Sequence, residues 1–242
     1  MIGFVNFKRK VKATTITTLS DNRLVKINPR EPSFFDAVLN FKSENEDIET
    51  HIFSFIEDAD KVKRASTEAF YRVIYDPSET GDHMTIDFQQ GKNPATGHSY
   101  NWWVEIASKM PPVEGRQWHI ATEYQYNAFL VWLINQLVKM GESVEEALYK
   151  VVMDSKELGH YYDSKNSSKG EYFETTGSRC VCGIYDLANT RKILQHQNSD
   201  YGNFVTAGGD YSCYGDGNPI AWIQHDYSED AIKYGSVGLL VL

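Results

Sequence analysis

Aromatic and short polar side chains are concentrated between residues 201 and 227, a composition typical of binding loops. A Tyr or Trp ring can lie against the apolar face of a sugar, while Asn, Asp and Gln side chains hydrogen-bond its hydroxyl groups. The same residue types dominate hot spots of protein–protein interfaces. We therefore predict a face that binds a glycan or a protein, formed by Tyr201, Asn203, Asp210, Tyr211, Tyr214, Asp216, Asn218, Trp222, Gln224, His225 and Tyr227.

Some of these residues have a second interpretation. Tyr211 and Trp222 could equally pack in the core, and His225 could be an ordinary surface residue. The three aspartates at 210, 216 and 226 could bind a cation if their loops converge, but Asp is also common in turns. We predict that this stretch binds a ligand without a metal ion.

Catalytic motifs are absent from the sequence. The seven histidines show no zinc spacing such as H-E-x-x-H, and there is no G-x-x-x-x-G-K-[ST], G-x-S-x-G or C-x-x-C. We therefore predict a protein that is not an enzyme, with no catalytic residue and no cofactor. We expect His119 to make a structural hydrogen bond. We also expect Cys180, Cys182 and Cys213 to be free thiols, buried or nearly so, because three cysteines cannot form a disulfide framework.

The charge balance and hydropathy argue against two classes of partner. With 24 basic and 33 acidic residues the formal net charge is −9, whereas contact with nucleic-acid phosphates needs a positive field. No apolar run approaches the roughly 18 residues of a membrane span, and the N-terminus lacks a basic-then-apolar signal pattern. We expect a soluble chain without an export signal that contacts neither nucleic acid nor the membrane interior.

The first 94 residues are predicted to be rich in β-structure. Residues 2–28 contain many β-branched side chains with partial alternation, and residues 84–88 alternate clearly. Residues 34–41 fit either a short helix or a strand. Residues 58–75 begin with helical spacing and change to a strand pattern near their end.

Three helices with clear start signals are predicted next, at 99–110, 122–140 and 143–153. Ser99 can cap the first of them. Each of the other two starts with a capping box, in which Thr or Ser is followed three residues later by Gln or Glu. The polar and aromatic segment 156–178 is predicted to be an ordered surface loop, with a mobile flap over a ligand as the alternative.

Four segments, in order along the chain, match motifs of one known family. Residues 118–126 (WHIATEYQY) resemble its W-H-L-[ML]-T-x-x-E-[WY], and residues 183–189 (GIYDLAN) resemble G-[IL]-[YF]-D-[ML]-x-G-N. Residues 208–211 (GGDY) are similar to G-G-S-[WY], and residues 238–242 (GLLVL) to the closing G-[FW]-R-x-x-L strand. The chain thus resembles the C-type-lectin fold, in the branch shared by formylglycine-generating enzymes and variable proteins of phage diversity-generating retroelements.

Two departures from the family motifs bear on cofactors. The acidic calcium ligand of the family segment N-V-W-E-W corresponds to Lys192, and an ammonium group cannot coordinate a hard cation. Formylglycine-generating members hold copper between two cysteines, of which Cys213 matches the first while Asn218 stands at the second. We therefore expect neither calcium nor copper, and an oxidase of that branch is the third hypothesis.

The resemblance implies an α+β fold in two parts. It covers a C-type-lectin-like ligand-binding domain at 95–242, with two helices flanking a twisted antiparallel sheet and long irregular loops. Residues 91–97, which contain Gly and Pro, are the best linker candidate. We therefore assign residues 1–94 to a smaller β-rich N-terminal region that serves attachment or assembly.

The resemblance also implies a non-enzymatic phage or prophage virion protein, made in the bacterial cytoplasm, that recognises a host-surface glycan or protein. A variable protein diversified by a retroelement is the more specific form of this hypothesis. Weak single sites bind tightly when several copies act together, so we expect a homo-oligomer that also contacts other virion proteins. The alternative is a structural virion subunit, such as a capsid decoration or tail connector, whose lectin-type fold only packs against its neighbours.

Overall fold

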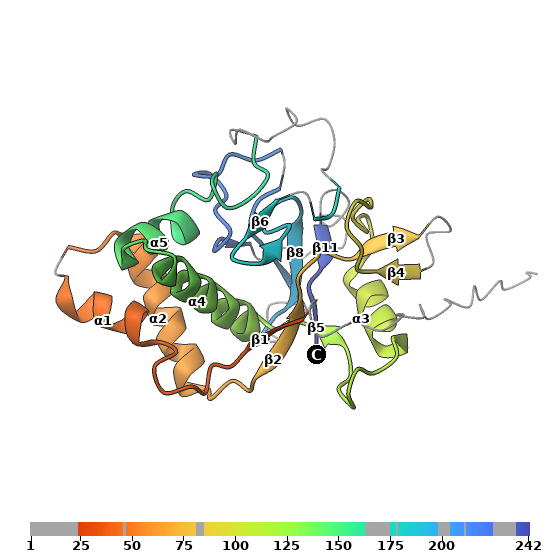
Figure 1. Cartoon of the computed structure of the whole chain (residues 1–242), viewed down its shortest axis with the longest axis horizontal. Coiled ribbons are helices and arrows are strands. Elements are labelled where there is room, and N and C mark those ends of the chain that lie inside the picture. The colour runs from red at the N-terminus through yellow and green to blue at the C-terminus, as the bar shows by residue number, and fades with distance from the viewer. Residues whose placement is uncertain are drawn as a thin grey trace, which may run out of the picture.

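The chain has a mixed α+β fold in which a layer of strands separates four helices from a fifth helix and a small hairpin (Figure 1). The computed structural model describes residues 24–45, 47–80, 85–162, 175–177, 179–197, 204–210, 212–224 and 236–242. No helix within these ranges is long and apolar enough to cross a membrane.

Two four-stranded sheets form the layer. The first has the order β1 (Leu24–Ile27), β2 (Phe70–Val73), β12 (Leu240–Val241) and β5 (His119–Ile120), and its neighbours pair antiparallel. The second has the order β10 (Ile223–Gln224), β9 (Phe204–Ala207), β8 (Arg191–Gln195) and β11 (Ser236–Gly238). Here β11 runs parallel to β8, and the other pairs are antiparallel.

The C-terminal segment joins the two sheets. After β11 the chain passes through Leu239 and enters the first sheet as β12. The Leu239 N–H donates to the Ile193 carbonyl at 3.2 Å, and the Leu239 carbonyl accepts from the Ala121 N–H at 2.8 Å. The Gln195 N–H donates to the Ala121 carbonyl at 2.9 Å. The two sheets are therefore held together by backbone hydrogen bonds.

The helices lie on both sides of this layer (Figure 1). One side carries α1 (Asp36–Glu44), α2 (Thr50–Arg64), α4 (Glu123–Lys139) and α5 (Val144–Val152). The other side carries α3 (Tyr100–Lys109) and the hairpin of β3 (Ser78–Thr80) and β4 (Thr85–Asp87). A second short hairpin, β6 (Cys180–Val181) and β7 (Ile184–Tyr185), precedes β8.

Each side of the layer has its own apolar core. Because side chains alternate between the two faces of a strand, neighbouring residues enter different cores. Leu194 and Val241 pack in the larger core with the four helices, whereas Ile193 and Leu240 pack in the smaller core with α3. The strand layer is thus buried on both faces.

The predicted starts of three helices are confirmed. The Ser99 side chain accepts a hydrogen bond from the Trp102 N–H at the start of α3. Both predicted capping boxes, at Thr122 for α4 and at Ser143 for α5, are formed. These caps satisfy backbone N–H groups that otherwise lack partners in the first turn of a helix.

The N-terminal region differs from its prediction. Its described residues, 24–45, 47–80 and 85–94, contain more helix than strand, because α1 covers most of the ambiguous stretch and α2 begins well before residue 58. The description of this region as β-rich is therefore wrong for these residues. Ile27, Phe34 and Ile56 also belong to the same core as residues of α4, so the two predicted regions share one core. The boundary near residue 94 stays a prediction.

The structure tests two further predictions, one on the three cysteine thiols and one on His119. Free thiols are confirmed for Cys180, Cys182 and Cys213, but Cys180 is exposed and the other two are half-buried, so the prediction of buried thiols is wrong for Cys180. Cys180 lies in a two-residue strand at the surface, where no core covers it. The structural hydrogen bond of His119 is present, with its Nε2 3.2 Å from Gln125 Oε1.

The close approach of β11 to α3 requires a glycine at position 238. A Cβ atom there would lie 2.5 Å from Cδ2 of the fully buried Trp103 ring. We expect Gly238→Ala to lower the free energy of unfolding by about 1–3 kcal/mol, because overpacking displaces a rigid ring or the strand. Urea unfolding measures this change. The control is Gly217→Ala, whose Cβ would meet its nearest neighbour at 3.7 Å, and an equal loss in both variants would contradict the argument.

Candidate functional site

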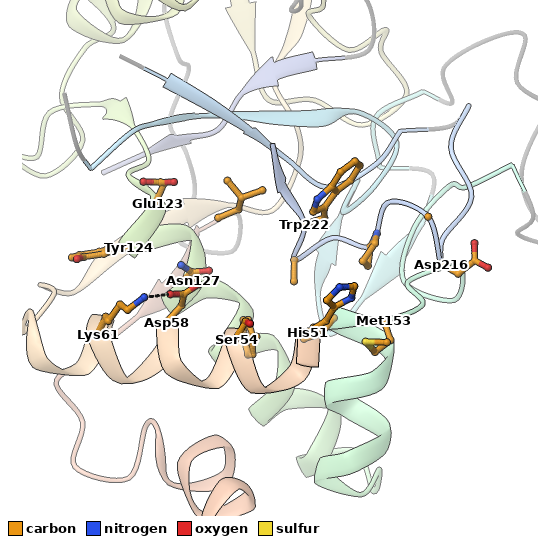
Figure 2. A pocket seen from close by; sticks show the side chains of 16 residues that line it. His51, Ser54, Asp58, Lys61, Glu123, Tyr124, Asn127, Met153, Asp216 and Trp222 are labelled. Carbon is orange, nitrogen blue, oxygen red and sulfur yellow. Dashed lines mark hydrogen bonds and ion pairs between the residues drawn. The ribbon is translucent and has the colours of Figure 1, made fainter. Parts of the chain in front are cut away.

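A pocket of about 840 Å³ opens between α2, α4, the end of α5 and the segment 212–224, which we call the pocket loop (Figure 2). This volume falls in the range of small-molecule sites, roughly 300–1,000 Å³. We call this cavity the helix–loop pocket. Its lining residues are His51, Ser54, Phe55, Asp58, Lys61, Glu123, Tyr124, Asn127, Val152, Met153, Asp216, Gly217, Pro219, Ala221, Trp222 and Ile223.

One wall comes from successive turns of α2. Residues three or four apart lie on the same face of a helix, which places His51, Ser54, Asp58 and Lys61 in one row (Figure 2). The opposite, buried face of α2 holds the helix against the core. Lys61 Nζ lies 2.7 Å from Asp58 Oδ1, and this ion pair raises the pKa of Lys61. The charges of Asp58 and Lys61 therefore largely cancel.

The first turns of α4 supply a second wall with Glu123, Tyr124 and Asn127 (Figure 2). The Glu123 side chain is only 12% exposed. Its Oε2 accepts from the Gln197 N–H at 2.9 Å and lies 2.8 Å from Nδ1 of His196. These contacts hold the carboxylate in one orientation beside the pocket.

Asn127 lines the same wall and is 7% exposed. Within the part of the chain that the structure describes, its side-chain amide has no hydrogen-bond partner. Its amide atoms are not fully enclosed by protein, and the side chain lines the pocket. Asn127 therefore offers a donor and an acceptor to a molecule in the pocket.

The third wall is the pocket loop, which is anchored from below by hydroxyl groups and backbone. The hydroxyl of Tyr126 donates to the Ile220 carbonyl at 2.7 Å, and the Ile220 N–H donates to Ser155 Oγ at 2.9 Å. The hydroxyl of Tyr161 donates to the Asn218 carbonyl at 2.8 Å. Burial raises the pKa values of Tyr126 and Tyr161, so both hydroxyls keep the proton that they donate.

Two residues of the predicted binding face line the pocket, Asp216 and Trp222. Trp222 is 43% exposed, so the prediction of an exposed ring fits the structure better than a core position does. In Figure 2 its ring lies across the pocket from α2. Asp216 is exposed at the end of the pocket that also carries Met153 (Figure 2).

Four other residues of that face are described but lie outside the pocket lining. Tyr214 is 54% exposed and stacks edge-on against Tyr162, with ring centroids 5.2 Å apart. Asn218 and Gln224 are half-buried. Asp210 is buried, where it accepts from the Ser212 N–H and lies 3.3 Å from Arg191 Nε, so it supports the loop instead of displaying a carboxylate.

The remaining residues of the predicted face lie outside the described ranges: Tyr201, Asn203, Tyr211, His225 and Tyr227. Conversely, the sequence reasoning missed the pocket residues of α2 and α4. Polar side chains at positions 51, 54, 58 and 61 follow helical spacing, and this pattern indicates one polar helix face. The pattern alone does not distinguish a pocket wall from a surface in contact with water.

A cluster of buried charges lies outside the pocket lining. Nζ of Lys192, 1% exposed, contacts Asp76 Oδ2, the Asp186 carbonyl at 2.7 Å and Thr190 Oγ1 at 3.1 Å. Arg72 is buried nearby and stacks over the Phe129 ring at 4.2 Å. Burial lowers the pKa of Lys192, while the Asp76 carboxylate opposes this shift.

The ammonium group of Lys192 therefore has three oxygen partners. Within the described ranges, no three His, Cys, Asp or Glu side chains are grouped so that they could hold a metal ion. Comparison with protein-family models, with curated proteins and with solved structures finds no match for this chain.

Proposed function

We propose that this chain is a non-enzymatic binding protein that holds a host-surface carbohydrate in the helix–loop pocket. The observation that carries the proposal is the exposed ring of Trp222 beside a pocket of about 840 Å³ with polar walls. A sugar presents an apolar face to such a ring and hydroxyl groups to its surroundings. Asn127, Ser54 and Asp216 supply donors and acceptors for those hydroxyls.

We further propose that the chain belongs to a phage or prophage virion and that residues 95–242 have a C-type-lectin-type fold. Three features support the lectin-type fold. The C-terminal strand β12 lies beside β5, the helices α3 and α4 flank the strand layer, and β8, β9 and β10 form an antiparallel meander. The wall contributed by α2 then means that the N-terminal region takes part in ligand binding.

A structural virion subunit is the second candidate. The observation in its favour is the pair of exposed rings, Tyr162 and Tyr214, which lies outside the pocket lining and could pack against a neighbouring subunit. A subunit of this kind would assemble tightly but would have no affinity for a free glycan.

Trp222→Ala separates the two candidates. We expect it to weaken binding to a glycan array and to whole host cells by roughly tenfold or more, because a stacking ring is a typical hot spot. Tyr149→Ala is the control, since Tyr149 is similarly exposed on α5 but does not line the pocket. Thermal unfolding checks that both variants fold. Equal binding by both variants, or no binding by the unmodified chain, would favour the structural subunit.

A further inference from the structure

We propose that the helix–loop pocket selects glycans that carry an unacylated amino group, with Glu123 receiving the ammonium. This inference rests on the proposed carbohydrate function and assigns its ligand class. It follows from the charge balance of the pocket, the hydrogen bonds of Glu123, the unpartnered amide of Asn127 and the position of Trp222.

Acidic groups outnumber basic ones in the pocket. Three carboxylates, those of Asp58, Glu123 and Asp216, face one ammonium group, that of Lys61, and Lys61 is already paired with Asp58. Counting His51 as neutral, two carboxylates remain without a cation among the lining residues. A site of this charge repels phosphate- or carboxylate-bearing glycans and attracts cationic ones.

Glu123 is the carboxylate best placed to bind a cation. Both of its contacts, from His196 and from the Gln197 N–H, use Oε2, so Oε1 keeps its capacity to accept within the described part of the chain. The two contacts at Oε2 hold the carboxylate in one orientation. Because Glu123 is 12% exposed, water screens its charge less than that of a surface carboxylate.

Asn127 completes the recognition of an amino sugar. It lies one helical turn from Glu123 on α4, and both residues line the pocket. Its amide oxygen can accept from the ammonium, and its amide nitrogen can donate to a neighbouring hydroxyl. A hydrogen bond to the ligand would give this amide a partner that the described part of the chain does not supply.

The Trp222 ring adds a preference for the same ligands. An aromatic face attracts cations as well as the apolar C–H face of a sugar. Acetylation of the amine removes the charge and leaves one N–H, so the carboxylate of Glu123 loses its counter-ion. The acetylated sugar therefore keeps the stacking contact but loses the charge-assisted hydrogen bond.

The test is calorimetric binding of the full chain to a trimer of β-1,4-linked glucosamine and to the N-acetylated trimer of the same length. We expect the amine trimer to bind roughly tenfold more tightly, and this preference to shrink as salt is added. Glu123→Gln should abolish the preference while leaving the acetylated trimer nearly unaffected. Glu145→Gln on the surface of α5 makes the same change of net charge outside the pocket and should preserve the preference.

Other outcomes would overturn the inference. Equal binding of the two trimers, or tighter binding of the acetylated one, would exclude ammonium recognition while leaving the carbohydrate function standing. Ammonium recognition would also be excluded if neither trimer binds while other glycans of the array bind in a way that depends on Trp222. Tighter binding of Nα-acetyl-lysine amide than of the amine trimer would point to a lysine of a protein partner instead. Loss of all glycan binding would remove the proposed function as well.

Discussion

Replacing Lys192 with Met should lower the free energy of unfolding by about 3–5 kcal/mol, the largest effect that we expect from a single substitution here. Met has a similar length and is apolar, so the substitution removes the charge with little change in volume. The carboxylate of Asp76 would then lose the only cation that contacts it among the described residues and keep Arg72 as a more distant one, and Thr190 and the Asp186 carbonyl would lose a donor. The cost comes chiefly from this buried carboxylate, which loses its direct ion pair.

Lys150→Met is the matched control for that prediction. Lys150 also forms an ion pair, with Glu142 at 2.7 Å, but both side chains remain in contact with solvent. We expect its loss to cost about 1 kcal/mol or less, because water replaces the lost partner. Urea unfolding at neutral pH compares the two variants. Similar losses in both variants would mean that water reaches the Lys192 cluster. Charge burial would then not determine the loss in the free energy of unfolding.

The double variant Asp76→Asn with Lys192→Met gives a second check. Removing both charges leaves the buried Arg72 with Asp186 as its remaining acidic neighbour, so the double variant should be more stable than Lys192→Met alone. A double variant less stable than the single one would show that packing, and not charge, accounts for the loss.

The sequence predicted helix starts well where a local side chain creates them. The helices α3, α4 and α5 each begin with a hydroxyl that accepts from the first turn, and all three starts are confirmed. Neither α1 nor α2 has a side-chain cap, since Phe35 and Glu49 precede them without such a bond. Their starts depend on packing against the rest of the core, which a local pattern does not contain.

The candidate site shows the same division between local and long-range information. Composition alone indicated Trp222 and Asp216, because a mixture of aromatic and short polar residues is typical of binding loops. Glu123 and Asn127 were assigned only to a helix, and the α2 wall was assigned to another region. What makes them a site is that α2 packs beside α4, a tertiary contact between segments far apart in the sequence.

The stability of this protein should also fall as the pH rises from about 4 to 7, through Asp186. Burial, together with the nearby Asp76 carboxylate, raises the pKa of Asp186 from 3.8 to about 7. The folded chain then keeps this proton at pH values where the unfolded chain has lost it. Because the folded state binds more protons between these pH values, its contribution to the free energy of unfolding declines with rising pH. The difference between the two pKa values corresponds to ~4 kcal/mol.

Asp186→Asn isolates this contribution from those of other titrating groups. The amide cannot ionise, and its oxygen can still accept from the Gly177 N–H, which lies 2.9 Å from Asp186 Oδ1. Asn also tolerates the positive φ of 58° at this position. We expect the unmodified chain to lose several kcal/mol relative to the variant between pH 4.5 and pH 8 in urea unfolding. A difference that stays constant with pH would mean that Lys192 keeps Asp186 ionised throughout, so that the cluster holds two balanced ion pairs at every pH tested.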